Sequence, residues 1–456
     1  MNKFFCSLTA LFFSVISIAQ EDVNYDDVAV IMNNNSSTSI LIGEYFQEKR
    51  SIPDINMIYI DVPVEEVIDS AQFELMRSQI EEYITGNNLQ DSLNYLVTTK
   101  GVPLRIEYGE CEATTGGGPF DFPKCSSVDS ELALMLEEYS DFINENGGLM
   151  NIYYEETNHF SRDEYGLYLV TRLSGHDIWD VKSLINRSGP NTPVADFGSN
   201  YVFDSFNWDM SGDSAWAADI LAPAHDYVVA QGWNSVLATE VDFLTEQESV
   251  FGYYCVSATG NADTDSPDNV WVKGSVATVF VESSASTFNY DGADDRLLLA
   301  DYIAEGACGG FGLANIEYMS MYPSALQFFT MYTDTSQHYN LAESYYSSIK
   351  QLSWQGVVIG DPKTSIIFDE FASLPPPKED VSFNLYPNPN QGNFTLEFGE
   401  LEVDQVQIFN LSGQVVHHEL VNQSQKMDLQ TDLTSGQYII SLIHKDGIIN
   451  QKMIIQ

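Results

Sequence analysis

The sequence predicts an α/β fold with a doubly wound, mainly parallel sheet, followed by a small all-β sandwich. Three observations lead to this expectation. Up to residue 370, short apolar runs alternate with amphipathic helical stretches. Residues 371–380, FASLPPPKED, contain three successive prolines and are typical of an extended linker. After the linker, short alternating segments are separated by turn residues, which indicates strands.

Strands and helices are expected to alternate through residues 20–370, the predicted main domain. The expected buried strands are Val28–Met32, Met57–Ile60, Tyr95–Thr99, Leu167–Thr171, Val250–Cys255, Ala307–Leu313 and Gly356–Ile359. The expected helices are Ser39–Lys49, Val64–Ile84, Asp177–Arg187, Ser214–Gln231, Asp294–Glu305 and Leu341–Leu352. Such alternation favours a parallel sheet that is covered on both faces.

The segment after the linker, residues 381–456, is expected to form the β-sandwich. Its predicted strands are Phe394–Phe398, Gln405–Phe409, Val415–His418, Gln437–Ile443 and Ile448–Ile455. Turn signals such as Asp446-Gly447 separate these strands. Because the pattern changes from mixed α/β to all-β at the prolines, we expect two domains.

Composition restricts the class of protein. The chain has 456 residues, with 19 Lys and Arg against 66 Asp and Glu, a formal net charge of −47. Hydrophobic residues make up 44%, enough for a packed core, so a disordered chain is not expected. The negative charge would repel a phosphate backbone and anionic lipid headgroups. We therefore expect neither nucleic acid nor a membrane surface as partner.

The N-terminus predicts export. A lysine at position 3 precedes an apolar run, Leu8–Ile18, and small residues lead to a cleavage site after Ala19. A membrane anchor is the alternative, but a spanning helix needs ~20 apolar residues. We expect residues 1–19 to be a signal peptide and the mature protein to be secreted, with no stable membrane insertion.

The cysteines agree with an exported protein. Removal of Cys6 leaves four of the five cysteines, and an even number outside the cell favours disulfides. Cys111 and Cys125 flank a glycine-rich loop and are expected to form one bridge. Cys255 and Cys308 either form a second bridge, if their strands are neighbours, or remain thiols.

Polar and basic residues at predicted strand ends indicate a binding crevice, because ligands of open α/β sheets bind at the carboxyl ends of strands. Simple helix capping, and pairing of the basic residues with the many carboxylates, are the alternatives. The candidate crevice residues are Asn33, Ser36, Ser39, Lys100, Arg105, Arg172 and Asp361.

An acidic loop follows the predicted strand at 250–255. Its oxygen-bearing side chains are spaced closely enough to surround one hard cation such as Ca²⁺. The spacing differs from that of an EF-hand, and a solvated acidic loop is the alternative. The candidate ligands are Asn261, Asp263, Asp265 and Asp268.

The C-terminal segment resembles a known family. The motif residues are Tyr386, Pro387, Asn388, Pro389, Gly392, Gly413, Gly436, Tyr438 and Lys452. Their order resembles the C-terminal sorting domain of the type IX secretion system of Bacteroidetes-type bacteria. This resemblance implies that the secretion machinery is a partner and that the chain crosses the outer membrane. It also implies removal of the domain, followed by release or by attachment to surface lipopolysaccharide. An ordinary ligand-binding β-sandwich is the alternative.

Residues 26–368 resemble an uncharacterised family of exported bacterial proteins. The motifs are Asn33 with Ser36 and Ser39, residues 50–53, 100–105 and 343–346, Ser353-Trp354, and Gly360-Asp361-Pro362. The layout and the Gly360-Asp361-Pro362 ending are more distantly similar to the caspase-like gingipain cysteine peptidases. That resemblance would make Cys308 the nucleophile, but the matching His position, near residues 256–258, has no His. An exported protein of undefined activity is therefore favoured over a cysteine peptidase-like hydrolase.

Overall fold

The computed structural model divides the chain into two compact units, residues 1–374 and 375–456. Each unit has its own hydrophobic core. The predicted signal peptide and linker lie outside the described residues. The structure describes residues 23–107, 125–136, 149–195, 199–204, 214–238, 244–256, 267–280, 283–289, 298–315, 322–369, 383–398, 403–410, 415–421, 426–431, 433–444 and 447–455.

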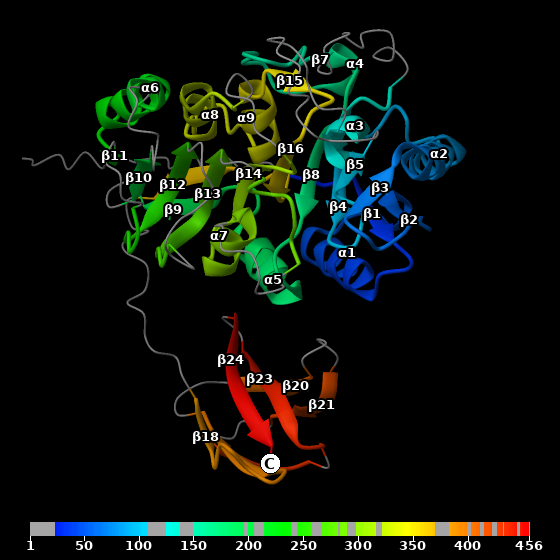
Figure 1. Ribbon diagram of the computed structural model, residues 1–456, viewed down its shortest axis with the longest axis vertical. Coiled ribbons are helices and arrows are strands. Elements are labelled where there is room, and N and C mark those ends of the chain that lie inside the picture. Colours follow the sequence, from blue (N-terminus) through cyan, green and yellow to red (C-terminus); the bar gives the residue numbers. More distant parts are fainter. Residues whose placement is uncertain are drawn as a thin grey trace, which may run out of the picture. The chain divides into compact units, whose positions relative to one another are not determined.

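Ten described strands form one large sheet in the first unit (Figure 1). Most neighbouring strands are parallel, as predicted. In order across the sheet they are β11 (Asn234–Ala238), β10 (Asn200–Asp204), β12 (Val250–Val256), β13 (Trp271–Phe280), β14 (Gly309–Leu313), β16 (Gly356–Gly360), β8 (Leu169–Leu173), β4 (Tyr95–Thr99), β1 (Val28–Asn33) and β2 (Met57–Ile60). β10, β11 and β13 are not among the strands expected from the sequence.

The strands on the two sides of β16 end at the same edge of the sheet. Arg105, which follows β4, donates to the carbonyl oxygen of Ala314, which follows β14, at 3.2 Å. We call this edge the carboxyl edge. β16 pairs antiparallel with β14 along its whole length, which sets its direction, and meets β8 only at the pair Ile359–Arg172, which is parallel in sense. Consequently Asp361, just after β16, lies at the opposite, amino edge, where Tyr25 donates to it from the segment before β1.

The order of the strands reverses at two places. β1 lies between β2 and β4, and β10 lies between β11 and β12. At such a switch point the chain leaves neighbouring strands in opposite directions, which opens a crevice beyond their carboxyl ends. The fold therefore offers two positions for a ligand at the carboxyl edge.

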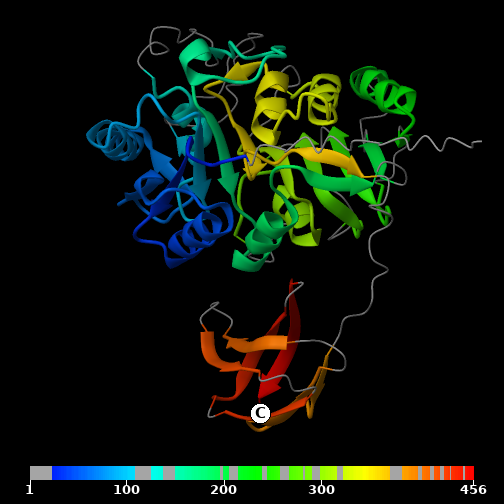
Figure 2. The same ribbon diagram turned by 180° about the vertical axis from the view of Figure 1, so that it is seen from behind.

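Helices cover both faces of the sheet (Figures 1 and 2). Below the sheet in Figure 1 lie α1 (Ser37–Arg50), α5 (Ile178–Arg187) and α7 (Leu299–Glu305). Above it lie α3 (Val128–Ala133), α6 (Ser214–Ala230), α8 (Ala325–Tyr332) and α9 (Leu341–Ser348). The remaining helices are α2 (Ser70–Gly86), which packs on β2, the short α4 (Arg162–Tyr165) and the 3₁₀ turn η1 (Asp54–Asn56). No described helix has both the length and the apolar character needed to cross a bilayer.

Local sequence explains where several helices begin. Asp69 and Gln72 form a capping box at α2, and Asn340 and Glu343 form another at α9. In each box the two side chains satisfy backbone N–H groups that the helix itself leaves without partners. α2 begins six residues later than predicted, because Val67–Asp69 forms a strand, β3, instead.

Small sheets complete the first unit. β3 pairs with β5 (Arg105–Glu107), which pairs with β6 (Cys125–Ser127). β7 (Leu149–Met150) pairs with β15 (Gln351–Leu352), and β9 (Thr192–Ala195) pairs with β17 (Ile366–Asp369). These pairings join segments that are far apart in the sequence, so local patterns give no sign of them.

The second unit consists of two antiparallel sheets, as the sequence indicated. One contains β18 (Asn384–Tyr386), β19 (Asn393–Glu397) and β22 (Lys426–Gln430). The other contains β21 (Val415–Leu420), β20 (Val403–Phe409), β23 (Gly436–His444) and β24 (Gly447–Ile455). Alternate residues, such as Phe394 and Leu396 in β19, are buried in the core of this unit.

Candidate functional site

A cavity of about 150 Å³ lies at the carboxyl edge beside the β1–β4 switch point. We call it the carboxyl-edge cavity. Segments that follow β1, β2, β4, β8 and β13 all contribute to its wall. Its polar lining includes Ser36, Thr38, Glu66, Lys100, Arg172, Ser174 and Asn289.

The loop after β1 is fixed by buried polar contacts. Asn33 donates through Nδ2 to the carbonyl oxygens of Pro63 (3.1 Å) and Gly101 (2.8 Å). Ser39 Oγ accepts from the Asn33 backbone N–H at 2.8 Å and lies 2.6 Å from Thr99 Oγ1. Both side chains are fully buried. Asn33 and Ser39 therefore hold the loops around the cavity in place rather than line it.

Ser36 caps α1 and lines the cavity. Its Oγ accepts from the backbone N–H of Ser39 at 3.2 Å. Gly101 lies directly opposite and has φ +103°, and a Cβ there would lie only 2.2 Å from Ser36 Oγ. Glycine at 101 therefore meets two needs at once, a left-handed backbone and a close approach to the start of α1.

Lys100 is a cation in the wall of this cavity. Its Nζ donates to the Phe288 carbonyl oxygen (2.5 Å) and to Asn289 Oδ1 (3.2 Å). Burial lowers the pKa of Lys100, while Glu66, the largest opposing charge, acts to raise it. Glu66 accepts from Thr287 Oγ1 (2.7 Å) and from the Phe288 N–H (2.8 Å). Lys100 and Glu66 thus both form hydrogen bonds with residues 287–289, the short segment after β13.

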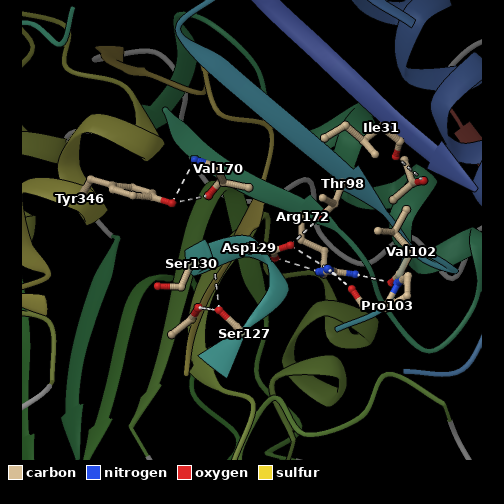
Figure 3. A network of polar contacts seen from close by, with 12 residues as sticks. Ile31, Thr98, Val102, Pro103, Ser127, Asp129, Ser130, Val170, Arg172 and Tyr346 are labelled. Carbon is tan, nitrogen blue, oxygen red and sulfur yellow. Dashed lines mark hydrogen bonds and ion pairs between the residues drawn. The ribbon is translucent and has the colours of Figure 1, made fainter. Parts of the chain in front are cut away.

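Arg172 is the largest fully buried side chain of the described residues, and its charge is neutralised internally (Figure 3). Its Nε and Nη2 donate to the two oxygens of Asp129 at 2.8 and 2.7 Å. It also donates to the carbonyl oxygens of Val102 (2.9 Å) and Pro103 (2.8 Å). Arg172 therefore shapes the loop after β4, and the predicted alternative of pairing with a carboxylate describes it well.

The structure brings six of the seven candidate crevice residues to the carboxyl edge and corrects the seventh. Asp361 lies at the amino edge, where it accepts from Arg50 Nε at 2.6 Å and from Tyr25. The reason is that β16 runs opposite to β14. Glu66 and Asn289, which the sequence did not single out, come from segments whose local patterns carry no signal of the site.

The two described cysteines of the sheet are not bridged to each other. Cys308 is a thiol, buried at the start of β14, and its N–H donates to the Ser275 carbonyl oxygen. Cys255 lies opposite Val279 in β13, four residues further along that strand than Ser275. The two cysteines therefore lie at different levels of the sheet, and the second disulfide is not formed. The predicted partner of Cys125, Cys111, lies outside the described residues.

Cys308 does not occupy the position that the peptidase resemblance requires. The strand after the one that ends at Val256 is β13, and Cys308 comes only later, before β14. Its Sγ lies near the carbonyl oxygens of Gly306 (3.7 Å) and Val272 (3.8 Å). Cys308 therefore lies at the amino end of a strand, whereas the peptidase resemblance requires a nucleophile at a carboxyl end.

Three of the four predicted calcium ligands, Asn261, Asp263 and Asp265, lie outside the described residues. Asp268 is exposed, and its backbone N–H donates to Glu305 Oε1 at 2.6 Å. Within the described part of the chain, no group of three or more His, Cys, Asp or Glu side chains could hold a metal ion. Calcium binding by this loop stays a prediction.

The sorting-motif residues hold the entry segment of the second unit against its last strand. Asn388 donates through Nδ2 to the Lys452 carbonyl oxygen (2.8 Å) and accepts from the Ile454 N–H (2.9 Å). Gly392 has φ +86°, and a Cβ there would lie 2.4 Å from the Thr431 carbonyl oxygen. Tyr438 donates to the Thr434 carbonyl oxygen at 2.8 Å. Gly413 lies outside the described residues.

Comparison with known proteins identifies this second unit. Residues 384–456 match the family of secretion system C-terminal sorting domains. Ulvan lyase NLR42 from Nonlabens ulvanivorans is 36% identical over 76 residues, which are 16% of this chain and 14% of that protein. The chain thus carries a type IX sorting domain, and it is a secreted protein, exported to the cell surface or the extracellular space.

Similarity to solved structures gives no further information about the first unit. An engineered protein is 10% identical and covers 94% of this chain and 93% of its own, with a TM-score of 0.14. A double mutant of the endo-β-1,4-mannanase of Cellulomonas fimi is 9% identical and covers 94% of both chains, also with a TM-score of 0.14. The function of the α/β unit must be argued from its own residues.

Proposed function

We propose that the α/β unit of this exported protein binds a small carboxylate-bearing molecule in the carboxyl-edge cavity. The observation that carries the proposal is Lys100, a half-buried cation in the wall of a cavity at a switch point of the sheet. Cations are scarce in a chain with 19 basic and 66 acidic residues. A lysine that is partly desolvated in such a chain gains much from an anionic partner.

The cavity limits the size and the chemistry of the ligand. A protein cavity of about 150 Å³ is known to hold benzene, so roughly six non-hydrogen atoms fit. Ser36 and Thr38 line the cavity at the start of α1, where the first backbone N–H groups of a helix lack internal partners. Glu66 on the same wall suits an amino or hydroxyl group of the ligand. A compact carboxylate with one further polar group matches this lining.

The peptidase alternative gains no support from the position of Cys308, so binding without catalysis is the favoured activity. The strand order β2-β1-β4-β8 supports the flavodoxin-like form of the predicted layout, in which ligands bind at the switch point. After loss of the sorting domain, the protein is either released or attached to surface lipopolysaccharide, as the sorting-domain resemblance implies.

The first test measures the binding of small carboxylates to the wild type and to a Lys100 variant. Formate, acetate, glycine and succinate are added separately to the mature wild-type protein, to Lys100→Gln and to Lys273→Gln, and binding is followed by calorimetry and thermal unfolding. Lys273 is exposed on β13, so its replacement removes the same charge away from the cavity. At ten times Kd, a ligand stabilises the native state by ~1.4 kcal/mol.

We expect at least one of these carboxylates to bind the wild type and Lys273→Gln, and to bind Lys100→Gln about tenfold more weakly or worse, because a charge-assisted hydrogen bond is lost. Affinity should also fall as the pH rises through the lowered pKa of Lys100, since only the ammonium form attracts a carboxylate. Equal binding by Lys100→Gln, or no binding of any of them at millimolar concentration, would contradict the proposal.

A further inference from the structure

We propose that the α/β unit has a second binding site, at its amino edge, for an oxyanion: a sulfate or phosphate, free or as an ester on a larger molecule. A cavity of about 350 Å³ lies there, and its lining includes Tyr95, His159, His338, Asn340, Glu343 and Lys363. This volume falls within the ordinary range of ligand pockets, ~300–1,000 Å³. We call it the amino-edge cavity.

This site is separate from the carboxyl-edge cavity. Tyr95 is the first residue of β4, whereas Lys100 follows the last residue of the same strand. Lys363 follows β16, whose end lies at the amino edge. The two cavities therefore lie at opposite edges of one sheet and share no lining residue.

Three basic side chains converge on the amino-edge cavity. Lys363 is held by its contacts with Asp27 Oδ1 (2.5 Å) and the Asn24 carbonyl oxygen (2.7 Å), and it lies 5.4 Å from the centre of the Tyr95 ring. His159 and His338 are two of only seven histidines in the chain. Each of these basic side chains also has a carboxylate nearby: Asp27 for Lys363, Glu343 for His159 and Asp334 for His338.

Glu343 lines the cavity and also contacts His159. The carboxylate is 3% exposed and accepts from the backbone N–H groups of Phe160 and Asn340, both at 2.9 Å. It also lies 3.1 Å from His159 Nδ1, and the backbone of Gln337 is a second hydrogen-bond partner of that ring. The His159 ring packs against Tyr339 at 5.1 Å between ring centres, which further limits its orientation.

Neutral donors add to the lining. Asn340 Nδ2 donates to the Tyr95 hydroxyl at 2.8 Å, so that hydroxyl accepts one bond and keeps its own proton for another. Burial raises the pKa of Tyr95 well above its ordinary value, which keeps the hydroxyl protonated at every physiological pH. An oxyanion has several acceptor atoms, and the hydroxyl can serve one of them while the cations serve the others.

Protonation of His159 raises the positive charge of this cavity. Lys363 and Glu343 carry opposite charges, so a proton on His159 adds a net positive charge to the lining. Two carboxylates flank the lining, Asp27 beside Lys363 and Asp334 near His338. The hydrogen bond to Glu343 raises the pKa of His159 above 6.5, against a smaller effect of burial. Oxyanion affinity should therefore fall as the pH rises through the raised pKa of His159.

The test uses sulfate and phosphate as probes on the protein that begins at residue 20 and keeps its sorting domain, at pH 5.5 and pH 8, with sodium chloride at matched ionic strength to remove general salt effects. The variants are His338→Gln, His159→Gln, Lys100→Gln and, as a matched control, His418→Gln, which changes an exposed histidine of the second unit. His338 is exposed but has a left-handed φ of +57°, so thermal unfolding of His338→Gln checks that its fold is intact. An ester such as glucose 6-sulfate shows whether the cavity admits a larger molecule.

We expect at least fivefold tighter binding at pH 5.5 than at pH 8, and at least a fivefold loss at pH 5.5 in both His338→Gln and His159→Gln. Binding should persist in Lys100→Gln and His418→Gln, which separates this site from the carboxyl-edge cavity. Equal affinity at the two pH values, unchanged binding in His338→Gln, or loss of binding in Lys100→Gln would overturn the inference.

Discussion

At the scale of single residues, two buried aspartates differ in how their negative charge is compensated. Asp129 is neutralised by Arg172, and both side chains are 2% exposed. Asp204, at the end of β10, is also fully buried, but its donors are neutral: Tyr253 OH at 2.9 Å and the Leu244 N–H at 3.0 Å. Its second oxygen has no hydrogen-bond partner in the described part of the chain. Burial, against these two hydrogen bonds, raises the pKa of Asp204 to about 6.

This shift makes stability depend on pH at a single residue. The pKa is higher in the folded than in the unfolded protein, so the stability that Asp204 contributes is complete below pH ~4 and is lost as the pH rises through about 6. A shift of roughly two units corresponds to about 3 kcal/mol. Asp204→Asn keeps the shape of the side chain and cannot ionise. Its stability relative to the wild type should therefore rise by about 3 kcal/mol between pH 4 and pH 7.5.

Urea unfolding of both proteins across this pH range measures the difference. Asp26→Asn serves as the control, because it removes the same kind of charge from an exposed position. A constant difference between Asp204→Asn and the wild type at all pH values would mean that Asp204 ionises normally in the folded protein.

At the scale of elements, the contact between β13 and β14 depends on the absence of a side chain. A Cβ on Gly310 would lie 2.3 Å from the Ala277 carbonyl oxygen and 2.8 Å from Leu299 Cδ1. The first of these atoms belongs to the paired strand and the second to α7, so neither can move freely. The apolar run around Cys308 therefore serves close packing of the two strands.

Gly310→Ala should destabilise the α/β unit by about 1–3 kcal/mol, because the extra methyl overfills a packed interior. Gly86→Ala is the matched control, since nothing lies within 4 Å of the position of its Cβ at the end of α2. That variant should be neutral or slightly more stable, because alanine is the better helix former. Thermal unfolding of the two variants and the wild type measures these stability changes. Equal changes in Gly310→Ala and Gly86→Ala would rule out the packing argument.

At the scale of the whole molecule, two units with separate cores correspond to two separate tasks. The second unit carries the sorting domain, and the first carries both candidate cavities. The candidate cavities therefore share no residue with the sorting domain.

We predict two cleavages during export, one after Ala19 and one near residues 371–385. Intact-mass analysis of the protein from the culture medium and the cell surface measures both ends. A chain that stops at residue 374 lacks the sorting domain and should fail to leave the cell, which is the control. Recovery of the exported chain with Lys452 still present would contradict removal of the sorting domain.

The local pattern of the sequence was sufficient for much of the fold. β1, β2, β4, β12 and β16 lie within a residue or two of their expected positions, because each is a short apolar run between turn signals. β13 was not expected, since Lys273 and Gly274 interrupt its apolar run. β3 was taken as the start of a helix because its partner, β5, is 38 residues away in register. A local pattern cannot report a partner so distant.

The sequence by itself determined that the protein is exported, since the sorting motifs are local, and it determined the ends of β1, β2, β4, β12 and β16 to within a residue or two. Tertiary structure decided where those ends lie. The antiparallel direction of β16 moved Asp361 to the amino edge, and the insertion of β13 separated Cys308 from Cys255. It also brought Glu66 to Lys100, and His159 to Glu343. The direction and order of strands follow from burial of the whole sheet, which no short segment of the chain encodes.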